Sequence, residues 1–258
     1  MDFVASLGLH DGGGNSMTLF YLKFCERPEY AEDFLDGNLY LNALKQFRDT
    51  EEAADGRGDD QEGVFLATAP HPGLILEIGG VRIDPADLTR SVLFYGCAEL
   101  NMNVLCLYAG STGTFDVGGN ADGSLDLTKV DMDAFLEHLR VPDECLSMGA
   151  HTVIVHKVSE FRRRLVAAAQ KAGARVEYKP VNYLPPDHSG RRHPVFDKPS
   201  RYAWQREHRF LFDFGRNEEI AGPVRLSVGS LRDICGILDP ASINGNLDFR
   251  PAATPPAP

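Results

Sequence analysis

The feature that most constrains the fold is a set of short apolar runs that do not alternate regularly with helices. Four of these runs lie between residues 64 and 110: VFLAT, LILEIGGVRID, VLFYGCAEL and NVLCLYAG. Their β-branched and aromatic residues are typical of strands, and Gly79-Gly80 predicts a hairpin turn. Because strands outnumber helices and no βαβ rhythm is visible, we expect an α+β fold, with a mostly antiparallel sheet core flanked by a few helices.

Two helices carry clear start and stop signals. Residues 159–172 form the clearest helix, with Ser159 as the expected N-cap, an alanine-rich interior and Gly173 as the stop. A shorter helix is predicted from Pro28 to the residues before Gly37. Strand composition is expected at 17–24, at 151–158 and at 175–184.

Composition predicts one main domain with two irregular ends. A chain of 258 residues with 43% hydrophobic content is long enough to bury a substantial core. We expect residues 1–16 to be a flexible N-terminal extension, and Met17 is an alternative start of the folded part. Residues 17–250 are predicted to be a single domain, and 251–258 to be a disordered Pro/Ala-rich tail.

Charge and cysteine usage narrow the partners and the location. The net charge of −11 disfavours general nucleic-acid binding, because such a surface repels phosphate backbones. The five cysteines are odd in number and widely spaced, with no CxxC pair or Cys/His cluster for zinc. No signal peptide or membrane span is visible, so we expect a cytoplasmic protein without a membrane partner.

The segment YAWQREHRFLF, residues 202–212, places three hydrogen-bonding side chains at alternate positions. If the whole segment is a strand, Gln205, Glu207 and Arg209 share one face, while Trp204 and His208 share the other. The polar face is then either an exposed surface carrying a Glu207–Arg209 ion pair, or the lining of a cleft in which Glu207 acts chemically.

Across most of residues 18–235 the chain resembles a group of uncharacterised bacterial and phage proteins known only as a domain of unknown function. The resemblance rests on an ordered series of segments. They are FLDGNLYLNALKQFRD, RGDDQEG, NVLCLYAG, HTVIVHKVSEFRRRL, VEYKPVNY and FDKPSRYAWQREHRF. This likeness indicates kinship and implies no particular chemistry.

The order LFYLKF, YAEDFLDGNLYLNAL and Gln205-Arg206-Glu207 also resembles that of mono-ADP-ribosyltransferases, which end on a strand with a Gln-x-Glu or Glu-x-Glu pair. The chain departs from that family in two ways. Its first strand offers Tyr21 or Lys23 in place of His or Arg, and no Ser-Thr-Ser strand is recognisable in the middle.

The resemblance implies an ADP-ribosyltransferase-like fold and NAD as the substrate, used to modify a host macromolecule by a toxin, phage-defence protein or phage effector. Glu207 would stabilise the positive charge that develops on the ribose, and Gln205 would orient the nucleophile. Tyr21, Lys23 and Tyr40 would line the cofactor site. Structural roles are the alternative for these three: half-buried tyrosines, and a lysine paired with Glu26.

Three further patterns admit a functional and a structural interpretation. Asp59, Asp60 and Glu62 in RGDDQEG suit a divalent cation; the alternative is a loop locked by Arg57 folding back onto Asp59. Arg162–Arg164 form a basic helix face that would suit a phosphate or simply face solvent. The loop around residues 118–129 resembles a calcium loop but lacks its first acid and its final glutamate, so we expect no calcium.

Two other classes of function remain open. Glu177 and Lys179, with Asp143 upstream, resemble the acidic pair and lysine of a metal-dependent nuclease, although Pro180 interrupts that strand. The third class, after the transferase and the nuclease, is a non-catalytic protein-interaction module whose polar loops bind a partner protein. A structure that disperses the candidate residues favours this third class.

Overall fold

The computed structural model of the protein describes residues 16–49, 58–119, 125–215 and 222–245. The chain divides into two compact units. Unit 1 comprises residues 1–39, 107–167 and 227–258, and unit 2 comprises residues 40–106 and 168–226. The single-domain extent of 17–250 stays a prediction. Residues 1–15 and 251–258, which the sequence assigns to irregular ends, lie outside the described residues.

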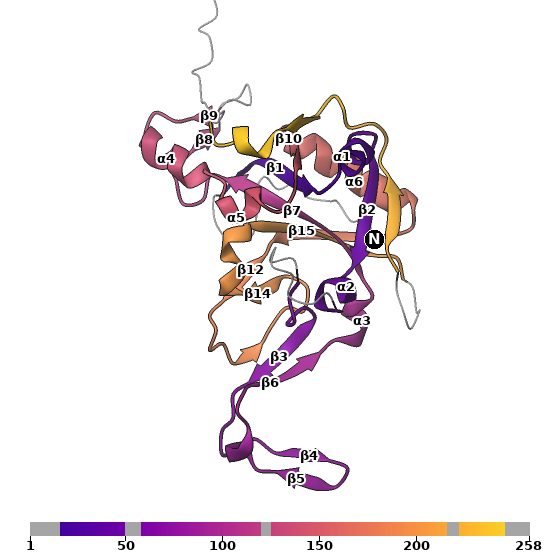
Figure 1. The fold of residues 1–258 in the computed structure, drawn as a ribbon, viewed down its shortest axis with the longest axis vertical. Helices are drawn as coiled ribbons and strands as arrows, with labels where there is room; N and C mark the ends of the chain where they lie inside the picture. The colour runs from indigo at the N-terminus through magenta and orange to yellow at the C-terminus, as the bar shows by residue number, and fades with distance from the viewer. Residues whose placement is uncertain (1–15, 50–57, 120–124, 216–221, 246–258) are drawn as a thin grey trace, which may run out of the picture. The chain divides into compact units, whose positions relative to one another are not determined.

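Unit 1 is built on an antiparallel sheet (Figure 1). Its strand β1 (Thr18–Cys25) pairs antiparallel with β10 (His151–Val155) on one side and with the unit 1 end of β7 (Asn103–Ser111) on the other. On the far side of β10 lies β17 (Cys235–Leu238), also antiparallel. The predicted strand at 17–24 is therefore confirmed.

Two helices of unit 1 pack together through aromatic side chains. Helix α1 (Pro28–Leu35) buries Phe34, whose ring stacks 5.9 Å from that of Phe161 on α6 (Val158–Lys171). The stop signals hold, because Gly37 and Gly173 follow the two helices with φ of 78° and 77°. The N-cap prediction is wrong: α6 already begins at Val158, so Ser159 lies inside its first turn.

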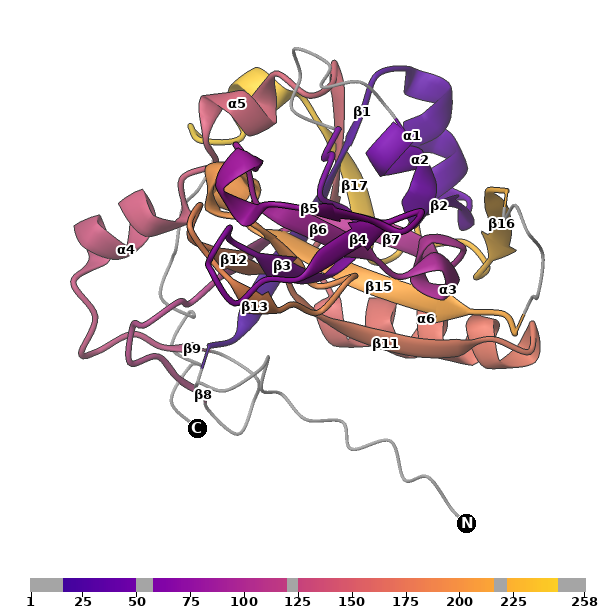
Figure 2. The same cartoon turned by 90° about the horizontal axis from the view of Figure 1, so that it is seen from below.

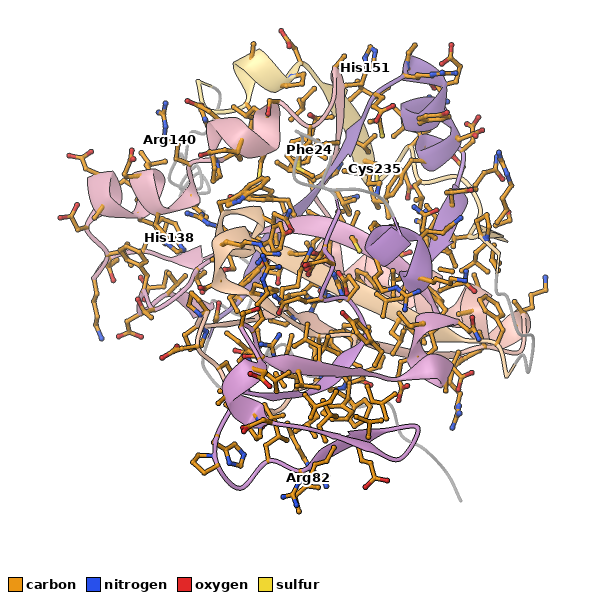
Figure 3. The ribbon with its side chains drawn as sticks, turned by 60° about the horizontal axis from the view of Figure 1, so that its bottom comes forward. Phe24, Arg82, His138, Arg140, His151 and Cys235 are labelled. Atoms are coloured by element: carbon orange, nitrogen blue, oxygen red, sulfur yellow. The ribbon has the colours of Figure 1, made fainter. Side chains whose placement is uncertain are left out.

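The remaining elements of unit 1 are short. They are β8 (Gly118–Gly119), β9 (Leu125–Asp126), α4 (Met132–Leu139), α5 (Asp143–Leu146) and η3 (Pro240–Ser242). Asp131 caps α4, since its carboxylate accepts a hydrogen bond of 3.2 Å from the Ala134 N–H. The imidazole Nε2 of His138 on α4, labelled in Figure 3, lies 3.0 Å from the Ser111 carbonyl oxygen at the end of β7.

Unit 2 is centred on β15 (Glu207–Asp213), which pairs antiparallel with β11 (Arg175–Pro180). The unit 2 part of β7 pairs antiparallel with β2 (Asn38–Ala43), and β16 (Val224–Ser227) pairs with β2. The predicted strand over 175–184 is divided in two, because β11 ends at Pro180 and β12 (Asn182–Leu184) follows. Strand β12 pairs in parallel with β14 (Asp197–Pro199), a local exception to the antiparallel pattern.

Most of the other strands and helices of unit 2 can be followed in Figure 2. A three-stranded antiparallel sheet joins β3 (Val64–Thr68), β6 (Val92–Tyr95) and β13 (Gly190–Arg191). A separate hairpin comprises β4 (Leu76–Ile78) and β5 (Val81–Ile83). The short helices are α2 (Leu44–Asp49), η1 (Pro85–Asp87), α3 (Cys97–Leu100) and η2 (Ser200–Gln205).

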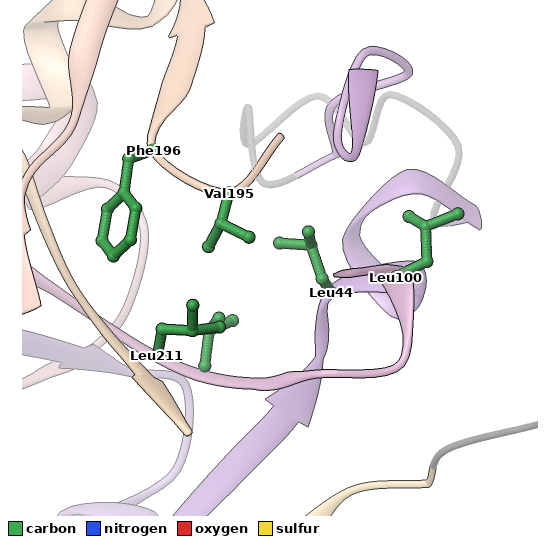
Figure 4. Close-up of a cluster of buried hydrophobic side chains, with 6 residues drawn as sticks. Leu44, Leu100, Val195, Phe196 and Leu211 are labelled. Carbon is green, nitrogen blue, oxygen red and sulfur yellow. The ribbon is translucent and has the colours of Figure 1, made fainter. Parts of the chain in front are cut away.

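A hydrophobic core within unit 2 joins side chains from distant parts of the chain (Figure 4). Its buried members are Leu44, Leu100, Val104, Val195, Phe196 and Leu211. The observed architecture is α+β with mostly antiparallel sheets and few helices, as predicted. Within the described ranges no helix is long and apolar enough to cross a membrane.

The prediction of one continuous strand through residues 202–212 is wrong. Residues 200–205 form the 3-10 helix η2, and β15 begins at Glu207. Between them, Arg206 has φ of 40°, and among the described residues it is the only non-glycine residue with a positive φ. Gln205 therefore does not belong to the strand that carries Glu207, and both faces of β15 are buried.

Candidate functional site

A cluster of polar side chains is buried inside unit 2. The described ranges hold ten buried polar or charged residues, and six of them form what we call the ionic cluster. Its members are Asp59, Glu62, Lys198, Gln205, Glu207 and Arg209. Burying so many ionisable groups is costly unless each charge is paired, so their contacts decide what the cluster can do.

Arg209 lies at the centre of the cluster and is 1% exposed. Its guanidinium binds the Glu62 carboxylate through two hydrogen bonds: Nη1 donates to Oε2 at 2.8 Å, and Nη2 donates to Oε1. Its Nε donates to Oε1 of Glu207 at 2.5 Å, and Nη1 also donates to the Val195 carbonyl oxygen. The planar donor fork of Arg209 is thus matched to two carboxylates and one backbone oxygen.

Lys198 is the second cation of the cluster and connects the predicted Gln-x-Glu pair. Its Nζ donates to Oε1 of Gln205 at 2.9 Å and to Oε2 of Glu207 at 3.0 Å. The same ammonium lies 3.7 Å from Oε1 of Glu62 and 5.0 Å from the ring centre of Tyr202. Gln205 and Glu207 come together at Lys198, although they belong to different elements.

The charges of the cluster support one another. Burial alone would raise the pKa of Glu207, but the positive charges of Arg209 and Lys198 outweigh burial and hold that pKa well below its usual range. Burial would likewise lower the pKa of Lys198 and of Arg209, yet the neighbouring carboxylates, Glu207 foremost, raise both pKa values. Glu207, Lys198 and Arg209 therefore remain charged at neutral pH.

Asp59 behaves differently from the other acids. Burial, reinforced by the negative charge of Glu62, raises its pKa to about 6. Its Oδ1 accepts a hydrogen bond of 3.0 Å from the Gln61 N–H. Its Oδ2 is buried, and none of the described residues supplies a hydrogen bond to that atom. Nη2 of Arg201 lies 3.9 Å from Oδ1.

The proposed cation site in RGDDQEG is not assembled among the described residues. Glu62 is engaged by Arg209, while Asp60 faces outward and accepts a hydrogen bond of 2.9 Å from Arg201. No group of three or more His, Cys, Asp or Glu side chains in the described ranges is arranged to hold a metal ion. Arg57, the alternative partner of Asp59, lies outside the described residues.

The three predicted cofactor residues are divided between the two units. Tyr40 is 50% exposed on unit 2, with the Arg225 guanidinium 5.9 Å from its ring centre. Tyr21 and Lys23 belong to β1 of unit 1. Tyr21 is fully buried, and its hydroxyl accepts hydrogen bonds from Nε and Nη2 of Arg162 at 2.8 and 2.6 Å.

Ion pairs with nearby acids engage side chains of both the basic helix face and the nuclease pattern. Arg163 and Arg164 both bind the Glu160 carboxylate, and Arg164 also binds Asp233. These pairs place acidic partners on the basic face. Lys179 pairs with Glu177 at 2.9 Å, whereas Asp143 belongs to α5 in unit 1.

Sequence reasoning missed Lys198, the residue that joins Gln205 to Glu207. Its nearest signal was its place in FDKPSRYAWQREHRF, seven residues before Gln205 and nine before Glu207. Tyr202, whose hydroxyl donates a hydrogen bond of 2.9 Å to the Gly58 carbonyl oxygen, was also missed. A charged residue such as Lys198, which lies nine residues from the buried Glu207 in the sequence, is a candidate partner for that acid.

No protein-family model, curated protein or solved structure matches the chain. The two resemblances to known families therefore rest on the sequence patterns alone.

Proposed function

We propose that the chain is a non-catalytic protein-interaction module in which the ionic cluster serves as the scaffold of unit 2. The observation that carries this proposal is the state of the Glu207 carboxylate. One oxygen is bound by Arg209 and the other by Lys198, and the side chain is 8% exposed. A substrate would reach this acid only after these buried ion pairs had been broken, which is strongly unfavourable.

The surface of unit 2 supports the same proposal. Eight large hydrophobic side chains are exposed in the described ranges, and five of them lie between residues 65 and 94. They are Phe65, Ile75, Ile78, Val81 and Phe94. Phe65 and Phe94 lie together, with ring centres 6.3 Å apart, and Ile78 is paired with Val81. Exposed apolar side chains that gather in this way are typical of a contact site for another molecule. The proposal also includes the cytoplasmic location expected from the sequence.

A matched pair of photo-crosslinking positions tests the interaction. Phe65 in unit 2 is 42% exposed and Ile237 in unit 1 is 41% exposed. A photoreactive amino acid placed at Phe65 should yield discrete cross-linked products in a cell lysate, while the same amino acid at Ile237 should yield far fewer. Equal yields at the two positions would contradict a role for the 65–94 surface.

One observation favours a second candidate, an NAD-dependent mono-ADP-ribosyltransferase with an ADP-ribosyltransferase-like fold. Gln205 and Glu207 converge on the same ammonium group, and the six buried residues of the cluster include three carboxylates and two cations. An excess of negative charge suits the positive charge that develops on ribose when the nicotinamide bond breaks. This candidate requires Lys198 to release Glu207, with NAD as substrate and a host macromolecule as target.

Labelled NAD separates the two candidates. For the interaction module we expect neither nicotinamide release nor transfer of label to proteins or nucleic acids of a lysate. In this assay Glu207→Gln should then be as inactive as the wild type. Activity that is lost in Glu207→Gln but kept in Glu177→Gln, a change at an exposed acid of the same unit, would establish the transferase instead.

A further inference from the structure

The ionic cluster holds more acids than bases. Asp59, Glu62 and Glu207 are buried there together with two cations, Lys198 and Arg209. Both cations donate hydrogen bonds to Glu207, and Arg209 also donates to Glu62. No described residue donates a hydrogen bond to the buried Oδ2 of Asp59. The buried charges of these five residues therefore balance only while Asp59 is protonated.

The backbone at Asp59 is fixed, whereas its side chain can turn at little cost. The Asp59 N–H donates to the Phe47 carbonyl oxygen at 3.1 Å, and the Asp59 carbonyl oxygen accepts from the Glu62 N–H at 3.1 Å. Among the described residues, the side chain has one hydrogen bond, which Oδ1 accepts from the Gln61 N–H at 3.0 Å. A rotation of this side chain therefore gives up one hydrogen bond and leaves both backbone bonds in place.

Two arginines lie close to Asp59 and outside the ionic cluster. The side chain of Arg201 is 45% exposed, and its Nη2 lies 3.9 Å from Oδ1 of Asp59. Nη1 of Arg192 donates to Oε1 of Gln61 at 2.7 Å, while its Nε is buried and no described residue accepts a hydrogen bond from it. Burial lowers the pKa of Arg192, and the negative charges of Asp197 and Asp59 oppose that shift. A second position for the Asp59 carboxylate is therefore available beside cationic groups.

We infer that Asp59 is a pH-operated switch, which lies inside the ionic cluster when protonated and turns outward to Arg192 and Arg201 when ionised. The structure describes the inward position. In both positions the cluster keeps two cations against two charged carboxylates, because the third acid is either neutral or outside. The outward position supplies an acceptor for Nε of Arg192, and it adds a negative charge beside the exposed Asp60. The inference goes beyond the proposed function and applies to either candidate.

The charged and titratable groups around Asp59 set the pH at which the switch operates. They come from its own loop, from β6, from the segment before β14, from β14, from η2 and from β15. In that order they are Glu62, Tyr95, Arg192, Lys198, Arg201 and Arg209. Burial, followed by the charge of Glu62, raises the pKa of Asp59 in the inward position to about 6. The outward position stabilises the ionised form, so the midpoint lies between the usual 3.8 and about 6.

Nuclear magnetic resonance of the isotope-labelled full chain, titrated from about pH 4 to about pH 8, tests the inference. As Asp59 turns outward, the Gln61 amide loses its acceptor. Its proton resonance should move upfield, and its protection against hydrogen exchange, corrected for the intrinsic rate, should fall by at least about tenfold. The Nε–H of Arg192 gains an acceptor, so its resonance should move downfield at the same midpoint. An Asp59 that ionises in place predicts the opposite for Gln61, because a carboxylate is the stronger acceptor.

Two matched pairs of variants assign the signals. Asp59→Asn cannot ionise and should abolish both titrations, whereas Asp60→Asn, at the exposed neighbouring acid, should leave both as in the wild type. Arg192→Gln removes an outward partner and should raise the midpoint of the Gln61 titration by at least about 0.5 pH unit. Arg191→Gln, at the exposed neighbouring arginine, should leave that midpoint unchanged.

The wild-type signals decide the question even if one of the variants does not fold. A downfield shift of the Gln61 amide, an Arg192 Nε–H that does not titrate, or a Gln61 titration that persists in Asp59→Asn would each overturn the switch. The cross-linking at Phe65 and the assay with labelled NAD test the two candidate functions separately. Neither of those results changes what the Gln61 and Arg192 resonances report.

Discussion

The side chains of Arg209 and Glu62 form a two-pronged ion pair that is closed to water on both sides, each residue being 1% exposed. Glu62 lies in the loop just before β3, and Arg209 lies in β15, 147 residues later. The pair therefore fixes a polar loop onto a buried strand. Neither charge can be removed without leaving the other unpaired inside the protein.

Removal of the Arg209 guanidinium should destabilise unit 2 severely. We expect Arg209→Met to lower the free energy of unfolding by about 3–5 kcal/mol, because Glu62 and Glu207 remain buried without their partner. Urea unfolding followed by the fluorescence of Trp204, the single tryptophan, reports on this unit. The control is Arg175→Met, which breaks a pair with Asp213 at an arginine that is 88% exposed. This control should cost less than about 1 kcal/mol, and equal losses would contradict the prediction.

The raised pKa of Asp59 should give the protein an unusual pH dependence. The folded-state pKa of about 6 exceeds the usual 3.8, so the folded protein holds this proton more tightly than the unfolded chain does. The resulting stability is fully present below pH 3.8 and is lost as the pH rises through 6. Above pH 6 the ionised, buried Asp59 costs about 3 kcal/mol relative to a group that keeps its ordinary pKa.

We therefore expect Asp59→Asn to be more stable than the wild type at pH 8, by up to about 3 kcal/mol, and nearly equal to it near pH 4. Urea titrations at a series of pH values measure the difference. Asp60→Asn, at the exposed neighbouring acid, is the control and should change stability by less than about 1 kcal/mol. Glu207 acts in the opposite direction: its pKa is lowered, so its contribution is present above pH 4.5 and is lost in acid. A difference between Asp59→Asn and the wild type that stays constant with pH would disprove the assignment.

The parts of the fold that local signals encode were predictable. The strand at β1 and the glycine stops after α1 and α6 depend on residues that are neighbours in the sequence. The α+β class also followed, because alternation of apolar residues and the irregular order of strands and helices are local patterns.

The geometry of the ionic cluster was not predictable in the same way. A strict two-residue alternation placed Gln205 on the strand, but the positive φ of Arg206 breaks that alternation. The alternation left open whether the polar face is exposed or lines a cleft. In the structure Glu207 and Arg209 are buried, and Arg209 binds Glu62 and the Val195 carbonyl oxygen from other parts of the chain. Contacts across such sequence separations leave no periodic signal.

Gly37 should be far less replaceable than Gly229, although both have a positive φ. Gly37 has φ of 78°, and an added Cβ would lie 1.8 Å from the Gly229 carbonyl oxygen. Gly229 has φ of 77°, but a Cβ there would meet nothing within 4 Å. We expect Gly229→Ala to cost about 1–2 kcal/mol from backbone strain, and Gly37→Ala to cost at least about 2 kcal/mol more from the clash. Calorimetric unfolding of the two variants measures this difference, and similar transition temperatures would refute the prediction.

The thiol of Cys235 should be nearly inert in the folded protein. Burial, followed by the negative charge of Asp233, raises its pKa from 9.0 to about 12. Because the thiolate is the reactive form, alkylation by iodoacetamide at pH 8 should be on the order of a thousandfold slower in the native protein than in urea. Mass spectrometry of the peptide that contains Cys235 measures the two rates. Asp233→Asn should accelerate the native reaction only slightly, because burial is the larger cause of the shift. A native rate close to the rate in urea would show that β17 opens readily and exposes this thiol.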